Sequence, residues 1–268
     1  MELTTRRNMA SASVSKADIV RRQKRILDLV QDLGFVSVSK LAESLRVSEQ
    51  TARRDLASLA NQGLVSKVHG GAGLPHATGD INYETRRRRF TDEKARIAKL
   101  VAESIPEDAT VFIDIGTTME AVAEALLDHR RLTVITNHIS AALILSRRSD
   151  FDIMLAGGIL RRRDNATTGE AAREFIEHFR VGYGIFGIGG ISPEGDLLDH
   201  DFRDIGVSRT AMRISKKRVF ALDHSKFEAD AAVRIGHVSD ADAVFTDTKP
   251  PRGVAKIMRD HGVKLVVA

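Results

Sequence analysis

The stretch that decides the organisation of this chain is Arg46-Val47-Ser48-Glu49-Gln50-Thr51-Ala52-Arg53-Arg54-Asp55-Leu56. Ser48 is a good N-cap for a helix, because its hydroxyl can accept a hydrogen bond from a backbone N–H of the first turn. Within that helix Gln50, Arg53 and Arg54 fall at i, i+3 and i+4, so they share one face. The apolar residues of the other face are Ala52, Leu56 and Leu59. The pattern predicts a helix with one buried face and one face of amides and guanidinium groups.

The exposed face of this predicted helix carries side chains that match the edges of DNA bases. Carboxamide and guanidinium groups can make paired hydrogen bonds to adenine or guanine in the major groove, and both also reach phosphate oxygens. We therefore predict a recognition helix for double-stranded DNA. Its expected contact residues, with the cap, are Ser48, Gln50, Thr51, Arg53 and Arg54.

Two shorter signals complete a helix-turn-helix. Apolar residues recur at helical spacing from residue 22 to residue 33, and a short second helix is expected to begin at Ser39. Val47-Ser48 then forms the turn into the recognition helix.

A small β wing is predicted after the recognition helix. Residues 64–71 alternate apolar and polar side chains before a glycine turn. Lys67 and His69 are candidate contacts to the sugar-phosphate backbone, although His69 could equally serve to cap the turn. Together these elements predict a winged helix-turn-helix over residues 21–74.

The positive charge of the chain lies in this same region. The formal net charge is +5, and residues 1–75 hold 12 Lys and Arg against 7 Asp and Glu, which leaves the remainder neutral. A basic excess beside a predicted DNA reader favours contact with nucleic acid.

Composition excludes several classes of protein. The 268 residues and 43% hydrophobic content suffice for two domains with cores of their own. There is no cysteine, so disulfides and thiolate metal sites are excluded. No apolar run approaches the roughly 20 residues of a membrane helix, and no signal peptide is recognisable. We expect a cytoplasmic protein with no cofactor, no metal site and no membrane contact.

The rest of the chain is divided by composition. Residues 1–20 are expected to form a flexible tail, and residues 75–92 a linker between two domains. The linker includes the run Arg86-Arg87-Arg88-Arg89, which could be a solvated surface, a subunit contact or a phosphate contact. Residues 93–268 form the second domain.

Short β-rich runs alternate with helical ones in this second domain, which predicts a Rossmann-like parallel α/β sheet. The predicted strands are 110–114, 132–136, 151–156, 182–187, 218–222, 243–246 and 264–267.

Small and polar residues follow several predicted strands. Ligands of open α/β sheets bind outside the carboxyl ends of the strands, so these residues should line one pocket. A turn with Asp114, Gly116, Thr117 and Thr118 can present backbone N–H groups and hydroxyls to a phosphate at a helix N-terminus, or can be a tight turn with threonine caps. The other residues expected at this pocket are Thr136, Asn137, Gly157, Gly158, Asp199, Asp204 and Lys226.

The last three of these residues bring charge. Lys226 offers a cation to an anionic ligand, and Asp199 and Asp204 offer acceptors to hydroxyl groups. The two aspartates could equally be solvated acids at the start of a helix. A small phosphorylated polyol or sugar satisfies the whole set.

These motifs resemble those of a known family. Val47-Ser48, Thr51-Ala52-Arg53-Arg54-Asp55-Leu56 and Val68-His69-Gly70-Gly71-Ala72 are similar to the DNA-binding domain of DeoR-type bacterial repressors. The sugar-phosphate sensor domain of that family, similar in fold to ribose-5-phosphate isomerase, is matched by Asp114-Ile115-Gly116-Thr117-Thr118, Thr136-Asn137 and Asp223-His224-Ser225-Lys226-Phe227. Finer matches, such as Gly169-Glu170-Ala171, imply glycerol 3-phosphate as the effector. Ser208-Arg209 stands where many relatives carry Lys-Arg.

The expected function is that of a transcriptional repressor, acting as a homodimer or homotetramer and released from its operator by the effector. A sugar-phosphate isomerase is the rival from another class, but no carboxylate sits in a motif that demands proton transfer, so we expect no catalytic residues. A third possibility is a constitutive DNA-binding protein whose second domain serves for assembly. A repressor that answers a different sugar phosphate also remains open.

Overall fold

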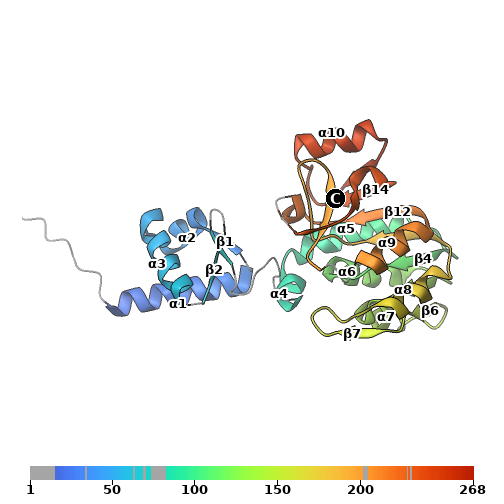
Figure 1. Ribbon diagram of the computed structural model, residues 1–268, viewed down its shortest axis with the longest axis horizontal. Helices are drawn as coiled ribbons and strands as arrows, with labels where there is room; N and C mark the ends of the chain where they lie inside the picture. The colour runs from blue at the N-terminus through green and yellow to red at the C-terminus, as the bar shows by residue number, and fades with distance from the viewer. Residues whose placement is uncertain are drawn as a thin grey trace, which may run out of the picture. The chain divides into compact units, whose positions relative to one another are not determined.

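The computed structural model describes residues 16–33, 35–62, 64–68, 71–73, 83–201, 205–227, 229 and 231–268. The chain divides into two compact units, Met1–Ile81 and Asn82–Ala268, each with a core of its own (Figure 1). None of the helices in the described ranges combines the length and the apolar character that crossing a membrane requires.

The first unit is a winged helix-turn-helix. Its elements are α1 Lys16–Leu33, β1 Phe35–Ser37, α2 Val38–Leu45, α3 Glu49–Asn61, β2 Ser66–Val68 and β3 Gly71–Gly73. The three strands form an antiparallel sheet in the order β1-β3-β2, so the predicted wing pairs with a strand ahead of α2 that was not expected. Buried apolar residues of all three helices, among them Ile26, Leu41 and Leu56, make the core.

Capping by serine hydroxyls sets where α2 and α3 begin. Ser48 accepts from the backbone N–H of Thr51 at 3.2 Å, as expected. The cap of α2 is Ser37, which accepts from the backbone N–H of Lys40 at 3.2 Å. The prediction that α2 begins at Ser39 is therefore wrong by one residue, since Ser37 supplies the acceptor and Val38 already belongs to the helix.

Helix α1 begins at Lys16, earlier than the expected start near Arg22. The predicted tail of residues 1–20 thus overlaps the helix by five residues. Asp18 in the first turn favours this longer helix, because a carboxylate complements the positive end of the helix dipole.

A parallel sheet forms the centre of the second unit. Its seven strands are β4 Thr110–Ile113, β5 Thr133–Thr136, β6 Asp152–Leu155, β9 Val181–Phe186, β12 Ser215–Ala221, β14 Ala243–Thr246 and β15 Lys264–Val267. Their order is β15-β14-β12-β9-β4-β5-β6, and every neighbouring pair is parallel. All seven predicted strands are confirmed, with ends that differ by up to three residues.

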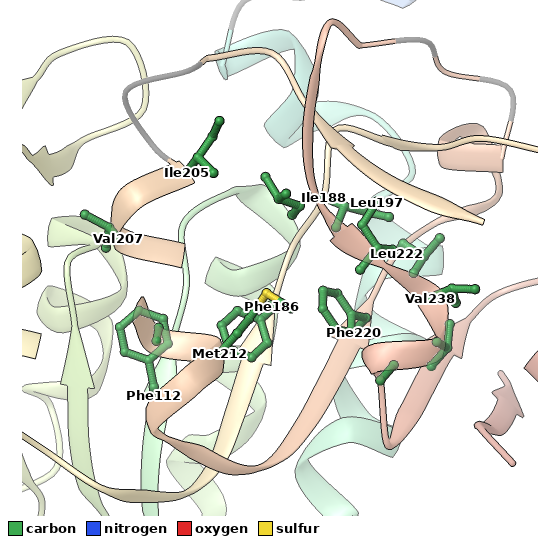
Figure 2. Close-up of a cluster of buried hydrophobic side chains, with 14 of the residues drawn as sticks. Phe112, Phe186, Ile188, Leu197, Ile205, Val207, Met212, Phe220, Leu222 and Val238 are labelled. Carbon is green, nitrogen blue, oxygen red and sulfur yellow. The ribbon is translucent and has the colours of Figure 1, made fainter. Parts of the chain in front are cut away.

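Helices cover both faces of the sheet, since the strands alternate their side chains between two cores. Val111 and Ile113 pack with one set of helices, and Phe112 between them packs with the other. The first set is α5 Thr91–Glu103, α6 Thr117–Ala125 and α7 Ile139–Leu145. The second is α8 Glu170–Glu177, α9 Ile205–Ile214 and α10 Arg252–Asp260. In the second core Phe112, Phe186 and Phe220 lie side by side across β4, β9 and β12 (Figure 2).

Short strands outside the main sheet were not predicted. They are the hairpin β7 Ile159–Arg161 and β8 Ala166–Thr168, and a small antiparallel sheet of β10 Gly190–Ile191, β11 Asp196–Asp199 and β13 Val233–His237. The described part of the unit also has three short 3-10 helices, η1 Leu126–Asp128, η2 His224–Phe227 and η3 Val238–Asp240. Strands of two to five residues are too short to show a clear alternation.

The second unit begins inside the predicted linker. Helix α4, Tyr83–Arg88, lies within residues 75–92, and α5 starts at Thr91. Tyr83 is 5% exposed and its hydroxyl donates to Glu120 of α6 at 2.7 Å. The predicted linker therefore includes residues that belong to the second unit. The run of arginines suggested a linker, but these arginines belong to α4 or follow it, and Tyr83 ties α4 to α6.

Candidate DNA-binding surface and effector site

Helix α3 has the two faces that the sequence predicted. Ala52, Leu56 and Leu59 are buried, whereas Gln50, Arg53 and Arg54 are exposed. Arg53 pairs with Glu49 one turn earlier at 3.0 Å, with both side chains more than half exposed. Exposed pairs of this kind contribute about 0.3 to 0.5 kcal/mol, so DNA can replace Glu49 as the partner of Arg53.

The remaining DNA-contact candidates are only partly described. Ser48 and Thr51 lie at the start of α3, and their hydroxyls are 3.0 Å apart. Lys67 lies on β2, and nothing is described of its side chain. His69 lies outside the described residues.

An ion pair that the sequence analysis missed ties α1 to α3. Asp55 accepts two hydrogen bonds from the guanidinium of Arg22, one of them from Nη2 at 3.1 Å. The side chains are 5% and 15% exposed, and hydrogen bonding to Asp55 raises the pKa of Arg22. The sequence does contain one sign of this ion pair, because Asp55 is a carboxylate on the apolar face of α3. Because the pair is largely buried, it fixes the orientation of α3 on α1.

In the second unit the strand order changes direction between β4 and β9. From β4 the chain adds β5 and β6 on one side, and β9, β12, β14 and β15 follow on the other. Ligands of open α/β sheets bind in the crevice at such a switch point. Asp114, Gly116, Thr117 and Thr118 follow β4 directly, so they lie at this crevice.

The turn after β4 leaves the start of α6 open to an acceptor. Gly116 sits at φ +118°, a conformation that favours glycine, and among the described residues no side chain caps this helix. Asp114, buried at 3% exposure, accepts from the hydroxyl of Ser208 at 3.2 Å. The N–H groups of the first turn and the hydroxyl of Thr118 can therefore face an anion.

Two of the predicted ligand residues are engaged by the protein itself. Thr136 is fully buried; its hydroxyl donates to the carbonyl of Ile113 at 2.7 Å and accepts from the N–H of His138 at 3.0 Å. Gly158 has φ +145°, and a Cβ there would come within 2.6 Å of the carbonyl oxygen of Thr168. Hydrogen bonds to the backbone at Thr136 and close backbone packing at Gly158 thus account for these residue types without a ligand.

Asn137 and Gly157 remain available at the same edge. Asn137 is 2% exposed and donates to the carbonyl of Thr167 at 3.0 Å, while its Oδ1 has no partner among the described residues. A buried acceptor without a donor is costly, so a ligand hydroxyl there would be stabilising. A Cβ on Gly157 would meet nothing within 4 Å, which leaves open space beside it.

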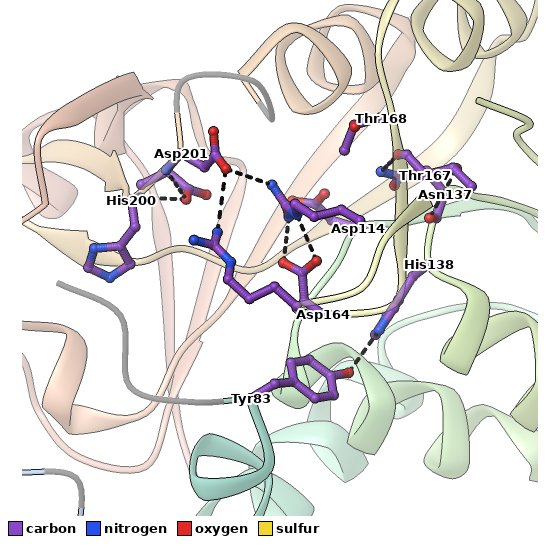
Figure 3. A network of polar contacts seen from close by, with 12 residues as sticks. Tyr83, Asp114, Asn137, His138, Asp164, Thr167, Thr168, His200 and Asp201 are labelled. Carbon is purple, nitrogen blue, oxygen red and sulfur yellow. Dashed lines mark hydrogen bonds and ion pairs between the residues drawn. The ribbon is translucent and has the colours of Figure 1, made fainter. Parts of the chain in front are cut away.

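A polar network joins α4, α6 and the loop after β5; Figure 3 shows its Tyr83 and His138. Because the Tyr83 hydroxyl donates to Glu120, it accepts from Nε2 of His138, 3.0 Å away. Arg87 completes the network by pairing with the other oxygen of Glu120 at 3.1 Å. Burial lowers the pKa of His138 to about 4, so its ring is neutral at pH 7. Sequence analysis missed this network, since Tyr83 fell in the predicted linker.

Arginines of the β7–β8 hairpin and nearby aspartates form a second group of ion pairs, whose Asp164 and Asp201 are labelled in Figure 3. Arg161 donates to Asp164 through Nε at 2.7 Å and reaches Asp201 at 3.4 Å, and Arg163 lies 3.7 Å from Asp201. The pairing explains why the hairpin can fold against the loop after β11. No sequence motif pointed to it.

Of the charged residues predicted at the pocket, Lys226 and Asp199 are near enough to interact electrostatically. Lys226 lies in η2 after β12, and its ammonium is within electrostatic reach of Asp223 and Asp199. Burial lowers the pKa of Lys226. Asp204 lies outside the described residues.

Comparisons with known proteins agree with this two-part architecture. The DeoR-like helix-turn-helix domain matches residues 22–78, and the DeoR C terminal sensor domain matches residues 89–248. This chain belongs to the DeoR family. The glycerol-3-phosphate regulon repressor of Escherichia coli (strain K12) is 45% identical over 91% of this chain and 97% of that protein. The repressor of the same name from Haemophilus influenzae is 42% identical over 92% of this chain and 96% of that protein.

Among solved structures, this DeoR-family chain resembles ribose 5 phosphate isomerase A from Neisseria gonorrhoeae. The identity is 16%, the match covers 53% of this chain and 54% of the isomerase, and the TM-score is 0.37. At that score the likeness carries no argument about chemistry.

Ser208 of α9 also contacts the turn after β4. It is 4% exposed. Its hydroxyl lies 3.2 and 3.4 Å from the two oxygens of Asp114. Helix α9 therefore contacts the turn after β4 through a hydrogen bond from a hydroxyl to the carboxyl group of Asp114.

Proposed function

We propose that this DeoR-family chain is a sequence-specific transcriptional repressor that leaves its operator when glycerol 3-phosphate binds to the second unit. The observation that carries the proposal is the 45% identity to a glycerol-3-phosphate regulon repressor, which extends over 97% of that protein and so includes both units. The exposed face of α3 supports DNA binding, and the open N-terminus of α6 supports a phosphorylated ligand.

The DNA-binding role falls to the first unit. Gln50, Arg53 and Arg54 are proposed to contact base edges and phosphates, with Ser48, Thr51, Lys67 and His69 contacting the backbone. One DNA-binding unit contacts a single half-site, so we propose a homodimer or homotetramer that places two such units on the operator. A protein that binds chromosomal operators acts in the bacterial cytoplasm, and we place this one there.

The effector role falls to the carboxyl edge of the parallel sheet. Gly116, Thr117 and Thr118 are proposed to bind the phosphate, and Asn137 a hydroxyl of the polyol. Asp114, Gly157, Asp199, Asp204 and Lys226 are proposed to complete the pocket. We propose no catalytic step, because the relatives are repressors and release from the operator requires a coupling free energy of only about 1 to 3 kcal/mol between the two sites.

The decisive experiment is a titration of the protein on DNA. Fluorescence anisotropy with the DNA upstream of its own genomic neighbours should show a complex, and glycerol 3-phosphate should weaken it by roughly 5-fold to 150-fold. Glycerol and inorganic phosphate are the matched controls, since each lacks part of the effector. Release by a different sugar phosphate alone would reject glycerol 3-phosphate and keep the repressor; no response to any phosphorylated compound would favour a constitutive DNA-binding protein.

Base readers and phosphate contacts should behave differently when they are removed. Arg53→Ala is expected to cost about 1 to 3 kcal/mol on the operator and to relax specificity. Lys67→Ala is expected to weaken binding to cognate and scrambled DNA alike and to reduce the salt slope by about 1. Arg259→Ala, an exposed arginine of α10, is a control with the same change of charge. Identical behaviour of the Arg53 and Lys67 variants on both DNAs would refute the assignment.

A further inference from the structure

Exposed apolar side chains gather at one side of the second unit. Leu143 of α7 is 67% exposed, Leu155 of β6 is 42% exposed, and Ile159 and Leu160 of β7 are 72% and 52% exposed. We name these four residues the apolar edge. Elsewhere in the described part of the second unit, Val267 of β15 is the one large apolar side chain exposed to a comparable degree. A local group of this kind marks a surface that another molecule can cover.

The elements that carry the apolar edge are bonded to one another. The Thr167 hydroxyl of β8 donates to the carbonyl oxygen of Ala156, which directly follows β6, at 2.6 Å. The N–H of Ile139, the first residue of α7, donates to the carbonyl oxygen of Asn165 in the turn of the β7–β8 hairpin at 2.8 Å. Figure 1 shows α7, β6 and β7 at the same end of the second unit. The four side chains therefore belong to one side of the unit.

Strand β6 ends the parallel sheet on this side. It pairs with β5, and its other side has no partner strand among the described residues. Unpaired backbone N–H and C=O groups of an edge strand can pair with a strand of another chain. Both edge strands of the sheet begin with an exposed charge, Lys264 in β15 and Asp152 in β6. Only β6 is followed by further exposed large apolar residues, so of the two edges it offers backbone and apolar contacts together.

Opposite charges lie at the two ends of this surface. Asp152 begins β6, and Arg162 lies beyond its end, in the turn of the hairpin. Both residues are exposed, and neither has an ion-pair partner among the described residues. Their neighbours differ in this respect, since Asp150 pairs with Arg148 at 3.0 Å. The surface thus has an acidic end and a basic end that the unit itself does not balance.

We propose that two copies of this chain associate through the apolar edge, with β6 of one copy antiparallel to β6 of the other. A two-fold axis brings the same surface of both copies together, so the start of each β6 lies toward the end of its partner strand. Asp152 then faces Arg162 of the partner subunit, and the exposed leucines and Ile159 are covered. A second copy is the occupant because symmetry supplies both of the opposite charges at the required ends. The inference rests on the proposed function, which needs two DNA-binding units on one operator, and it names the surface that joins them.

Sedimentation equilibrium of the full-length protein, without DNA or effector, measures this association. Ile159→Glu places a charge within the apolar edge and should weaken the association at least roughly 30-fold, which turns a dimer into a monomer or a tetramer into a dimer. Val267→Glu is the matched control, because it makes the same kind of change at the end of the opposite edge strand. The control should associate like the wild type.

A charge reversal tests how the two copies are arranged. Asp152→Arg and Arg162→Asp each place like charges at both ends of the proposed interface, and each should weaken the association roughly 10-fold. The double variant restores opposite charges and should associate nearly as tightly as the wild type. Weak association of the double variant, after losses in both single variants, would refute the antiparallel arrangement.

The outcomes are separable from those of the proposed function. A wild type that stays monomeric, or an Ile159→Glu variant that associates like the wild type, overturns the inference, while operator binding and its release by glycerol 3-phosphate decide the function independently. A wild type that associates through the apolar edge but binds no operator keeps the inference and rejects the function. Circular dichroism shows whether Ile159→Glu is folded, and the charge reversals carry the test if it is not.

Discussion

Replacing Asp55 with alanine is expected to lower the free energy of unfolding of the first unit by about 3 to 5 kcal/mol. The reason is that Arg22, whose side chain is 15% exposed, loses its carboxylate partner and keeps its charge in a largely buried position. The change should also weaken operator binding, since Arg22 and Asp55 fix α3 on α1. Urea unfolding followed by circular dichroism measures the loss. Tryptophan fluorescence cannot report it, because the chain has no tryptophan.

Two variants separate the loss of the buried pair from a loss of charge. Glu49→Ala also removes a carboxylate from α3, but from an exposed pair, and should cost less than about 1 kcal/mol. The double change Arg22→Met with Asp55→Leu removes both buried charges and should recover most of the stability, as replacement of buried pairs by apolar residues often does. A double variant as unstable as Asp55→Ala would show that the unpaired charge is not the cause.

Phe186→Ala is expected to destabilise the second unit by about 3 to 5 kcal/mol. Phe186 is 1% exposed, and its ring centroid lies 5.8 Å from that of Phe112 and 5.3 Å from that of Phe220 (Figure 2). Truncation leaves a cavity at the centre of the sheet, where β9 neighbours β4. For a unit of this size each kcal/mol lowers the melting temperature by about 2 to 4 °C, which calorimetry resolves.

The second transition of the same thermogram serves as the internal reference for Phe186→Ala. The first unit has its own core, so its transition should move little. Phe186→Leu keeps most of the side-chain volume and should cost less than about 1.5 kcal/mol. Equal losses for the leucine and alanine variants would mean that ring contacts, rather than the cavity, account for the stability.

Periodic patterns in the sequence predicted most of the helices and strands of the fold. The seven strands of the parallel sheet were predictable, because runs such as Thr110–Ile113 are β-rich and lie between helical segments. The two faces of α3 followed from residue spacing alone. Ser37 was missed in favour of Ser39, since both lie at the start of the same apolar run and the register of one turn decides between them.

The residues of the effector site remain a prediction. Loop residues after β4 and β5 were proposed because polar and small residues follow those strands, yet Thr136 and Gly158 satisfy the protein's own packing. The burial of Lys94 was not predicted, because nothing in a helical run shows that one lysine is 4% exposed and donates to the end of another helix.

The sequence by itself determined the elements of this protein: which residues form helices and strands, which faces are apolar, and where the basic charge lies, because each depends on neighbours within a few turns. Only the tertiary structure decided the order of the strands, with its switch between β4 and β9, and the contacts Arg22 with Asp55 and Lys94 with α4. These contacts join groups from separate elements, and a charge is buried there only because its partner arrives from another part of the fold.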